Sequence, residues 1–244
     1  MFKSLNGVVL PGGGQDLKTS GYAKASQFFF EKSVEAYAKG DIFPILGICL
    51  GFEQLTEMVY GKNWLTQCDA ENVLLPLKFL PAYNTSRLFK GFTPDLLVAL
   101  ETKPITANFH HKCMTPKNFS LSGLDKFYDA LSTSIDKDGL EFISTMEAKK
   151  FPFYGLQWHP EKAVYEWTER EHLPHSYEAI RISQTIINFF VNEARRSRHA
   201  FVNSTVEMTS LIYNYPLYYA AMKTSKFTQI YSDNETVATK GSRP

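Results

Sequence analysis

The chain has 244 residues, of which 44% are hydrophobic and 14% aromatic, so it can bury a sizeable core and fits one large domain. Its 26 basic and 25 acidic side chains give a formal net charge of +1, which excludes a global field that would attract nucleic acid or an anionic membrane. No apolar run approaches the roughly 18 residues of a transmembrane helix. We therefore expect a small or locally charged partner, with no nucleic acid and no membrane span.

Alternating strands and helices are predicted along the chain. The strands are expected at residues 5–10, 42–46, 73–80, 96–100, 106–109, 141–146 and 154–158. The helices are expected from Ser20 to a stop at Gly40, at 52–60, and at about 177–198, where Ile180, Ile187, Val191 and Ala194 would form the apolar stripe. A polar turn is predicted at 136–139, and residues 225–244 read as a polar C-terminal tail.

The cysteines are too few to form a framework. Cys49, Cys68 and Cys113 are an odd number without the spacing of metal ligands, so we expect neither a disulfide framework nor a zinc site. At least one thiol must stay unpaired within the chain. We expect Cys68 and Cys113 to be buried core residues.

Cys49 is the strongest candidate for chemistry. It lies in the run Gly-Ile-Cys-Leu-Gly at residues 47–51, between a predicted strand and a predicted helix. This is the layout of a nucleophile elbow with sulfur in place of the serine oxygen. The glycines permit the strained turn, and the N-terminus of the following helix favours a thiolate. A lone cysteine after an apolar run is usually a core residue, so the assignment needs partners elsewhere in the chain.

Further polar groups also follow predicted strands. A glycine-rich turn at 11–14 follows the first strand, His110 and His111 follow residues 106–109, and His159 follows the last strand. In a largely parallel sheet, ligands bind beyond the carboxyl ends of the strands, so these groups should converge. His111 is expected to be incidental, and His172, His175 and His199 are expected to be structural or solvated.

Cleavage of an amide assigns roles to these groups. Cys49 would attack the carbonyl, and His159 would protonate the leaving nitrogen and later activate water. Glu161, held two residues further by Pro160, would orient His159 through its other ring nitrogen. The oxyanion would be held by the Leu50 N–H and an amide of the turn at Gly13 and Gly14.

Three segments carry a family resemblance: Leu-Pro-Gly-Gly-Gly at 10–14, Gly-Ile-Cys-Leu-Gly-Phe-Glu at 47–53 and Gln-Trp-His-Pro-Glu at 157–161. Together they resemble the signatures of class I glutamine amidotransferase-like hydrolases. Further segments, at 106–110, 141–147, 155–163, 165–167 and 189–195, resemble the gamma-glutamyl hydrolase family within that class. The resemblance implies an α/β three-layer sandwich with a mostly parallel central sheet, no metal and no organic cofactor.

The resemblance also implies a substrate and further site residues. It suggests a cysteine hydrolase that cleaves the γ-glutamyl bonds of folate and antifolate poly-γ-glutamates through a thioester. His110 would assist catalysis or substrate binding. Glu53, one turn beyond the nucleophile, would meet the substrate's amino group, the alternative being a solvated helix residue. The competing functions are a glutaminase module that passes ammonia to a synthetase and a catalytically compromised, shortened chain.

The resemblance bears on domain limits and destination too. In the family pattern, a signal peptide and a strand-helix-strand portion precede the segment that opens this chain. We therefore expect one domain over residues 1–224 that lacks the first strand-helix-strand unit. The family is lysosomal or secreted, whereas no signal peptide is visible here and a cytoplasmic form is the alternative. Sequons at Asn84, Asn118, Asn203 and Asn234 would favour the secretory route, and the resemblance also implies a homodimer.

Overall fold

The computed structural model describes residues 1–168, 170–219 and 229–231. These residues form two compact units. Of the described residues, one unit contains Phe2 and those from Ser4 to Arg198, and the other contains Met1, Lys3 and those from His199 onward. The boundary expected between the domain and a tail, at 224 and 225, lies outside the described residues, so the predicted domain limits stay a prediction.

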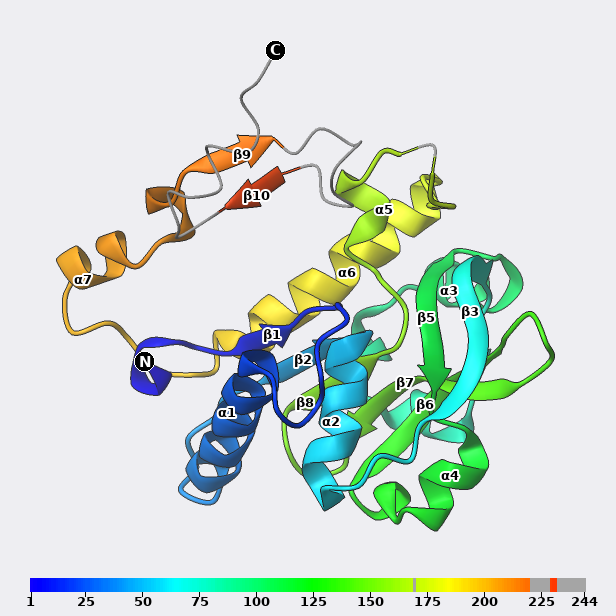
Figure 1. Cartoon of the computed structure of the whole chain (residues 1–244), viewed down its shortest axis with the longest axis horizontal. Helices are drawn as coiled ribbons and strands as arrows, with labels where there is room; N and C mark the ends of the chain where they lie inside the picture. Colours follow the sequence, from blue (N-terminus) through cyan, green and yellow to red (C-terminus); the bar gives the residue numbers. More distant parts are fainter. Residues whose placement is uncertain (169, 220–228, 232–244) are drawn as a thin grey trace. The chain divides into compact units, whose positions relative to one another are not determined.

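A central sheet of six strands organises the larger unit (Figure 1). In spatial order its strands are β1 (Val8–Leu10), β2 (Ile45–Ile48), β8 (Phe153–Leu156), β7 (Glu141–Ala148), β6 (Tyr128–Ile135) and β4 (Lys78–Phe79). β1, β2 and β8 run parallel, whereas β7, β6 and β4 join them in antiparallel pairs. The carboxyl ends of β1, β2 and β8 therefore lie side by side, and the chain segments that follow these three strands meet there although they are distant in sequence.

Helices cover both faces of this sheet. Adjacent strand residues point to opposite faces, so Ile45 packs in a cluster with α1 (Gly21–Tyr37) and α2 (Leu50–Tyr60). Leu46 packs in a second cluster with α3 (Pro94–Thr102) and α6 (Tyr177–Ala194). The α/β fold class is thereby confirmed.

Shorter elements complete the two units. In the larger unit they are α4 (Pro116–Leu121), α5 (Lys162–Tyr165) and 3-10 turns at Pro81–Thr85, Phe89–Gly91 and Leu124–Lys126. A further 3-10 turn spans Phe2–Ser4. The smaller unit contains α7 (Ser204–Thr209), a 3-10 turn at Ile212–Asn214, and the antiparallel strands β9 (Leu217–Tyr219) and β10 (Gln229–Tyr231). None of the described helices is long and apolar enough to cross a membrane.

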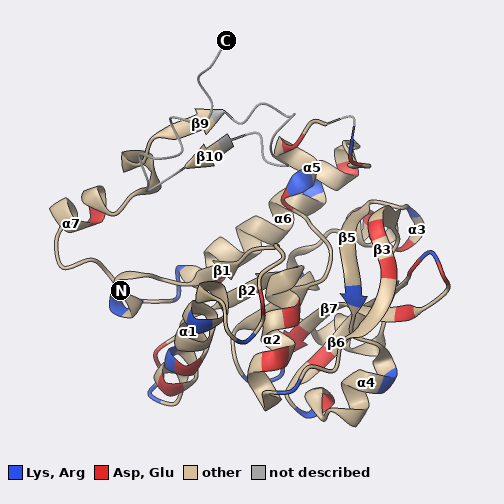
Figure 2. Cartoon of the chain, viewed as in Figure 1, with Lys and Arg blue, Asp and Glu red and all other residues tan. Residues whose placement is uncertain are grey.

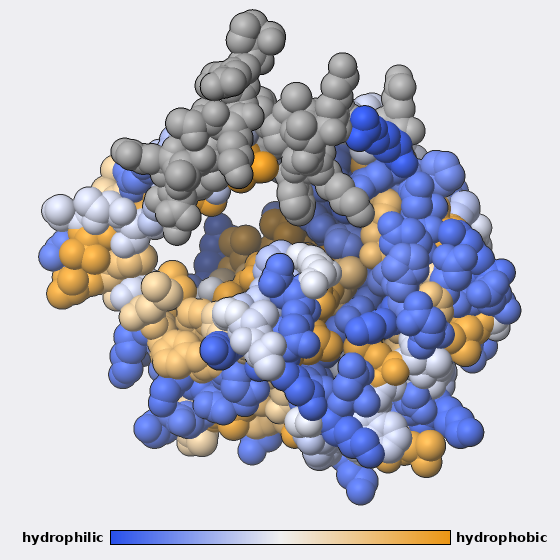
Figure 3. All heavy atoms as spheres, in the orientation of Figure 1, coloured by the Kyte–Doolittle hydropathy of each residue, from blue (hydrophilic) through white to orange (hydrophobic). Residues whose placement is uncertain are grey.

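An antiparallel ribbon, which the sequence did not indicate, stands apart from the central sheet. It pairs β3 (Thr66–Leu75) with β5 (Thr106–Cys113). The strand expected at 106–109 is therefore longer, and His110 and His111 lie within it instead of following it. The surface over β3 and β5 is mainly hydrophilic (Figure 3), in keeping with a ribbon that has one face toward solvent.

Two expectations were wrong, one about a strand at residues 96–100 and one about the buried face of the late helix. Residues 96–100 belong to helix α3, because a short apolar run fits a buried helix as well as a strand, and Pro94 occupies its first turn. On α6 the buried residues include Ile182, Ile186 and Phe190, while Ile187 and Val191 are each 39% exposed. The apolar stripe expected from the sequence therefore lies beside the face that is buried. Both faces carry apolar residues at helical spacing, so the spacing alone does not tell which of them is buried.

The cysteine expectation also needs correction. Cys68 on β3 and Cys113 on β5 form a disulfide, and Cys49 is free and buried. Both partners are buried as expected, but their pairing depends on the ribbon and not on their spacing in the sequence. Cys49 is therefore the thiol that remains for chemistry among the three.

The sequons differ in accessibility. Asn84 and Asn203 are exposed. The side-chain nitrogen of Asn118 donates hydrogen bonds to the Trp64 carbonyl and the Thr66 hydroxyl, so a glycan there would replace at least one donor hydrogen of this pair of bonds. Asn234 lies outside the described residues.

The turn from β2 into α2 packs directly against β1. A Cβ atom on Gly51 would lie 2.0 Å from the Leu10 carbonyl oxygen, and one on Gly47 would lie 2.4 Å from the Gly51 carbonyl oxygen. Glycines at these two positions therefore let the first turn of α2 sit against the neighbouring strand.

We predict that Gly51→Ala destabilises the fold by about 1–3 kcal/mol or more, because the new methyl group would overlap backbone atoms of β1. Urea unfolding of the purified variant measures this loss. Gly91→Ala is the matched control, since a Cβ atom there meets nothing within 4 Å. Equal stability of the two variants would contradict the close packing of the elbow on β1.

Candidate active site

Cys49 is held in a strained conformation between β2 and α2. Its backbone has φ of 53° and ψ of −105°, outside the regions that L-residues prefer. Its N–H donates to the Leu156 carbonyl of β8 at 2.8 Å, and its carbonyl accepts the N–H of Glu53 in the first turn of α2. The predicted elbow is therefore present, with the sulfur at the N-terminus of a helix, where a thiolate is favoured.

His159 follows β8 and lies beside Cys49. Its backbone N–H donates to the Ala107 carbonyl at 2.9 Å. Its ring lies close to Cys49, because a Cβ atom on Gly12 would lie 3.4 Å from both Cys49 Cβ and His159 Nε2. A Cβ atom on Gly12 would lie 2.6 Å from the His159 ring, so the glycine-rich turn leaves the space that the imidazole occupies. Phe109 packs edge-on against the same ring at 5.8 Å.

Glu161 completes a row of three side chains. Its Oε1 lies 2.6 Å from His159 Nδ1, while its Oε2 has no hydrogen-bond partner among the residues that the structure describes. The Nδ1–H of His159 donates to this carboxylate, which leaves Nε2 for Cys49. The structure thus brings Cys49, His159 and Glu161 together in the order that the sequence indicated.

The charges of this row favour a protonated imidazole. Burial alone would lower the pKa of His159, but the hydrogen bonds and charges of Cys49 and Glu161 outweigh it and raise the pKa to about 10. His159 is therefore an imidazolium at neutral pH, ready to pair with a thiolate and to donate a proton.

A cavity of about 340 Å³ opens beside Cys49. Gly13, Gly14 and Leu50 line it with the nucleophile, and a Cβ atom on Gly13 would lie 3.5 Å from the Leu50 side chain. The residues expected to supply oxyanion donors are therefore gathered next to the sulfur.

Charged side chains of both signs line the same cavity. Lys18, His111 and Lys112 contribute basic groups, and Asp16, Glu53 and Glu57 contribute carboxylates. Figure 2 shows these charges on their elements, with acidic residues on α2 and a basic residue near the end of β5. The cavity suits a ligand that carries both carboxylates and hydrogen-bond donors.

Glu53 is buried, so the alternative of a solvated helix residue was wrong. It is 6% exposed, and Gln157 Nε2 donates to its Oε1 at 3.4 Å. Burial raises the pKa of Glu53 to about 7, against smaller opposing effects of Gln157 and of the Lys112 charge. Its carboxyl group therefore changes charge near neutral pH.

His110 lines the cavity from β5. It is 4% exposed, with Nε2 at 3.2 Å from Asn108 Oδ1 and Nδ1 at 3.1 Å from the Lys112 carbonyl oxygen. Burial lowers its pKa to about 4 despite the Lys112 hydrogen bond, so His110 is neutral where His159 is charged. The ligand atoms of Cys68, His110 and Cys113 lie within 4.8 Å of one another, but the bridged sulfurs offer no thiolate to a metal.

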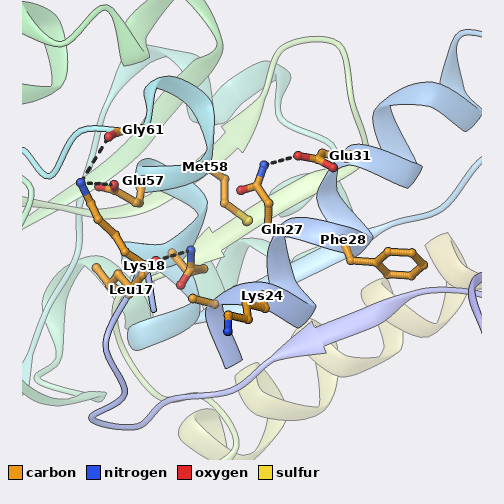
Figure 4. A pocket seen from close by; sticks show the side chains of 11 residues that line it. Leu17, Lys18, Lys24, Gln27, Phe28, Glu31, Glu57, Met58 and Gly61 are labelled. Carbon is orange, nitrogen blue, oxygen red and sulfur yellow. Dashed lines mark hydrogen bonds and ion pairs between the residues drawn. The ribbon is translucent and has the colours of Figure 1, made fainter. Parts of the chain in front are cut away.

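A larger hollow, of about 530 Å³, lies between α1 and α2 (Figure 4). In this hollow Lys18 reaches Glu57 at 3.2 Å and the Gly61 carbonyl at 3.4 Å, while Gln27 donates to Glu31. It contains no cysteine or histidine. The smaller cavity beside Cys49 is therefore the candidate active site.

Comparisons with known proteins show the family of this chain. A family model described as glutamine amidotransferase class-I matches residues 2–171. Gamma-glutamyl hydrolase of Homo sapiens is 42% identical over 95% of this chain and 72% of its own length. Gamma-glutamyl hydrolase B of Dictyostelium discoideum is 39% identical over 96% and 68% of the respective lengths. The chain belongs to the gamma-glutamyl hydrolase family.

Some features of this family member were not found from its sequence. Lys18 and Lys112 are two among 26 basic residues, and only the fold shows that they line the cavity. The sequence held a partial signal for Lys112. Side chains of a strand alternate between its two faces, so Lys112, two residues from His110, is expected on the same face of β5 as His110.

We predict that Glu161→Gln lowers the pKa of His159 from about 10 toward its ordinary value, because the variant removes the negative charge that stabilises the imidazolium. Hydrolytic activity should fall at least about 10–100-fold, the scale known for the loss of groups that orient metal-bound histidines. NMR titration of the histidine ring resonances measures the shift.

The pH profile provides a second readout. Activity of the unaltered chain should decline as pH rises through about 10, and in Glu161→Gln this decline should begin at lower pH. Glu166→Gln is the matched control, because Glu166 pairs with Lys162 and not with His159. An unchanged alkaline limb in Glu161→Gln would refute the orienting role.

Proposed function

We propose that this chain hydrolyses the γ-glutamyl bonds of folylpoly-γ-glutamates through a cysteinyl thioester. The observation that carries the proposal is the row of Cys49, His159 and Glu161 on a nucleophile elbow, in a chain 42% identical to a human gamma-glutamyl hydrolase. Roles for individual residues follow from their contacts.

Acylation begins with the thiolate of Cys49. The sulfur attacks the γ-carbonyl carbon, and the resulting oxyanion accepts hydrogen bonds from the Leu50 N–H and an amide of the turn at Gly13 and Gly14. Loss of one such donor costs about 2.7–4 kcal/mol in serine hydrolases. The imidazolium of His159 then gives its Nε2 proton to the leaving nitrogen, and the C–N bond breaks to leave a thioester.

Deacylation uses the same imidazole as a base. His159, now neutral, takes a proton from a water molecule that attacks the thioester carbonyl. The C–S bond breaks, and the thiolate of Cys49 and the imidazolium form again. Glu161 holds the Nδ1–H throughout, so Nε2 always faces the reacting atoms.

The cavity charges suggest how the substrate is held. Each glutamyl unit of the chain carries an α-carboxylate and an amide N–H. Lys112, with Lys18 and His111 nearby in the lining, would hold the carboxylates, and Glu53 would accept the amide N–H of the attacked unit. His110 would serve as a neutral polar group on the same wall.

The remaining features implied by the resemblance stay predictions. They are the homodimer and a lysosomal or secreted destination, with a cytoplasmic form as the alternative. A glutaminase role would be indicated if the chain released ammonia from free glutamine faster than glutamate from a folate pentaglutamate.

We predict that Cys49→Ala abolishes glutamate release from a folate pentaglutamate, with a loss of more than about 10⁴-fold, because no thioester can form. Chromatography of the products measures both the rate and the chain lengths. Binding of the pentaglutamate, measured by calorimetry, should persist in this variant. Turnover retained in the absence of the sulfur would overturn the mechanism.

We predict that Lys112→Met raises KM for the pentaglutamate about tenfold, equivalent to about 1.4 kcal/mol, and leaves kcat nearly unchanged. The reason is the loss of a charged hydrogen-bond donor to a substrate carboxylate. Lys149→Met is the control, since Lys149 pairs with Asp129 and follows β7, which runs antiparallel to β8, so it lies at the end of the strands away from His159. Equal KM values in the two variants would remove Lys112 from the binding site.

A further inference from the structure

The disulfide between Cys68 and Cys113 lies next to a histidine of the cavity. It ties β3 to β5 across a Cα–Cα distance of 6.0 Å. The two sulfurs lie 3.8 Å and 3.5 Å from Nδ1 of His110, and all three residues are buried. A change in the state of the sulfurs therefore acts directly on His110.

The hydrogen bonds of His110 make it sensitive to such a change. A neutral imidazole donates from only one ring nitrogen, whereas both nitrogens of His110 face oxygen atoms, those of the Lys112 carbonyl and the Asn108 side chain. The sulfurs of the disulfide carry no proton, so they cannot donate a hydrogen bond to the ring nitrogen of His110 that carries no hydrogen. A Cys113 thiol would supply one to Nδ1 and would favour the proton on Nε2, directed to Asn108.

We propose that Cys68–Cys113 is a thiol-sensitive site whose redox state sets the tautomer and position of His110 in the catalytic cavity. The inference rests on the proposed function for its activity readout. With the bridge formed, β5 is held to β3 beside the residues His110, His111 and Lys112 that line the cavity. With the bridge open, this wall loses its covalent tie.

A small thiol such as glutathione is the co-reactant. Cys68 is 7% exposed and Cys113 is fully buried, so the thiolate attacks Cys68 Sγ, forms a mixed disulfide and releases the Cys113 thiolate beside His110. A second small thiol then attacks the sulfur of the first small thiol in the mixed disulfide, and Cys68 is released as a thiol. In sum, two small thiols become one small disulfide, and the protein disulfide becomes two thiols.

Reductant would act on two sites in opposite directions. Cys49 must be a free thiol for catalysis, whereas the bridge must be intact for the cavity wall. The unaltered chain and Cys68→Ala/Cys113→Ala are therefore compared before and after dithiothreitol, with the reductant removed by anaerobic desalting. Thiol titration of the denatured unaltered chain should rise from one to three thiols per chain.

We expect reduction to lower kcat/KM of the unaltered chain at least threefold, and reoxidation to restore it. The ring resonances of His110 should move at constant pH, identified by their absence in His110→Gln. The pH must be held because His159, His111 and Asp136 also act on His110. In Cys68→Ala/Cys113→Ala the His110 resonances should not respond to dithiothreitol, and activity should not fall, because only Cys49 remains for the reductant to act on.

Three results would overturn the proposal. These are three free thiols in the aerobically purified chain, resonances of His110 that do not change on reduction, and an equal response of activity in the double variant. If the double variant does not fold, the reduction and reoxidation cycle of the unaltered chain decides alone. An unaltered chain that is inactive in both states would count against the proposed function, while the thiol titration and the His110 resonances would still test this inference.

Discussion

The site depends on one backbone constraint, the contact of the first turn of α2 with β1 and β8. Gly51 approaches the Leu10 carbonyl so closely that no side chain fits, and the Cys49 N–H is fixed by the Leu156 carbonyl. These contacts hold Cys49 at a positive φ that an isolated turn would not keep. Because β1, β2 and β8 are neighbours in the sheet, the same packing sets the glycine turn, the sulfur and His159 side by side.

Two buried histidines show how the partners of a group decide its charge. His159 and His110 are 8% and 4% exposed, and burial lowers the pKa of each. The hydrogen bonds and charges of Cys49 and Glu161 reverse the effect for His159, whereas His110 faces neutral oxygens and two bridged sulfurs. An imidazolium that can donate a proton thus lies beside Cys49, while the imidazole that lines the cavity next to the sulfur is neutral and cannot compete for that proton.

Local patterns were sufficient to predict that Cys49, His159 and Glu161 come together. Cys49 is framed by glycines within two residues on either side, and Glu161 lies two residues from His159, so short-range geometry determines both relations. The bridge between Cys68 and Cys113 spans a sequence separation of 45 and depends on the register of β3 with β5, which no local pattern encodes. The strand prediction for residues 96–100 was wrong for a different reason, since five consecutive apolar residues fit a buried helix and a strand equally well.

The electrostatics of the cavity explain how a chain of formal net charge +1 can select a polyanion. Lys18 and Lys112 lie on the cavity lining with Glu53, so the field that meets the ligand is local and of mixed sign. Burial keeps the pKa of Glu53 near 7, which lets that carboxyl group lose its charge beside anionic substrate groups at little cost. The same group, once ionised, accepts an N–H. Under the proposed function, selectivity for a γ-linked chain would come from the spacing of these charges around Cys49 and not from the total charge of the protein.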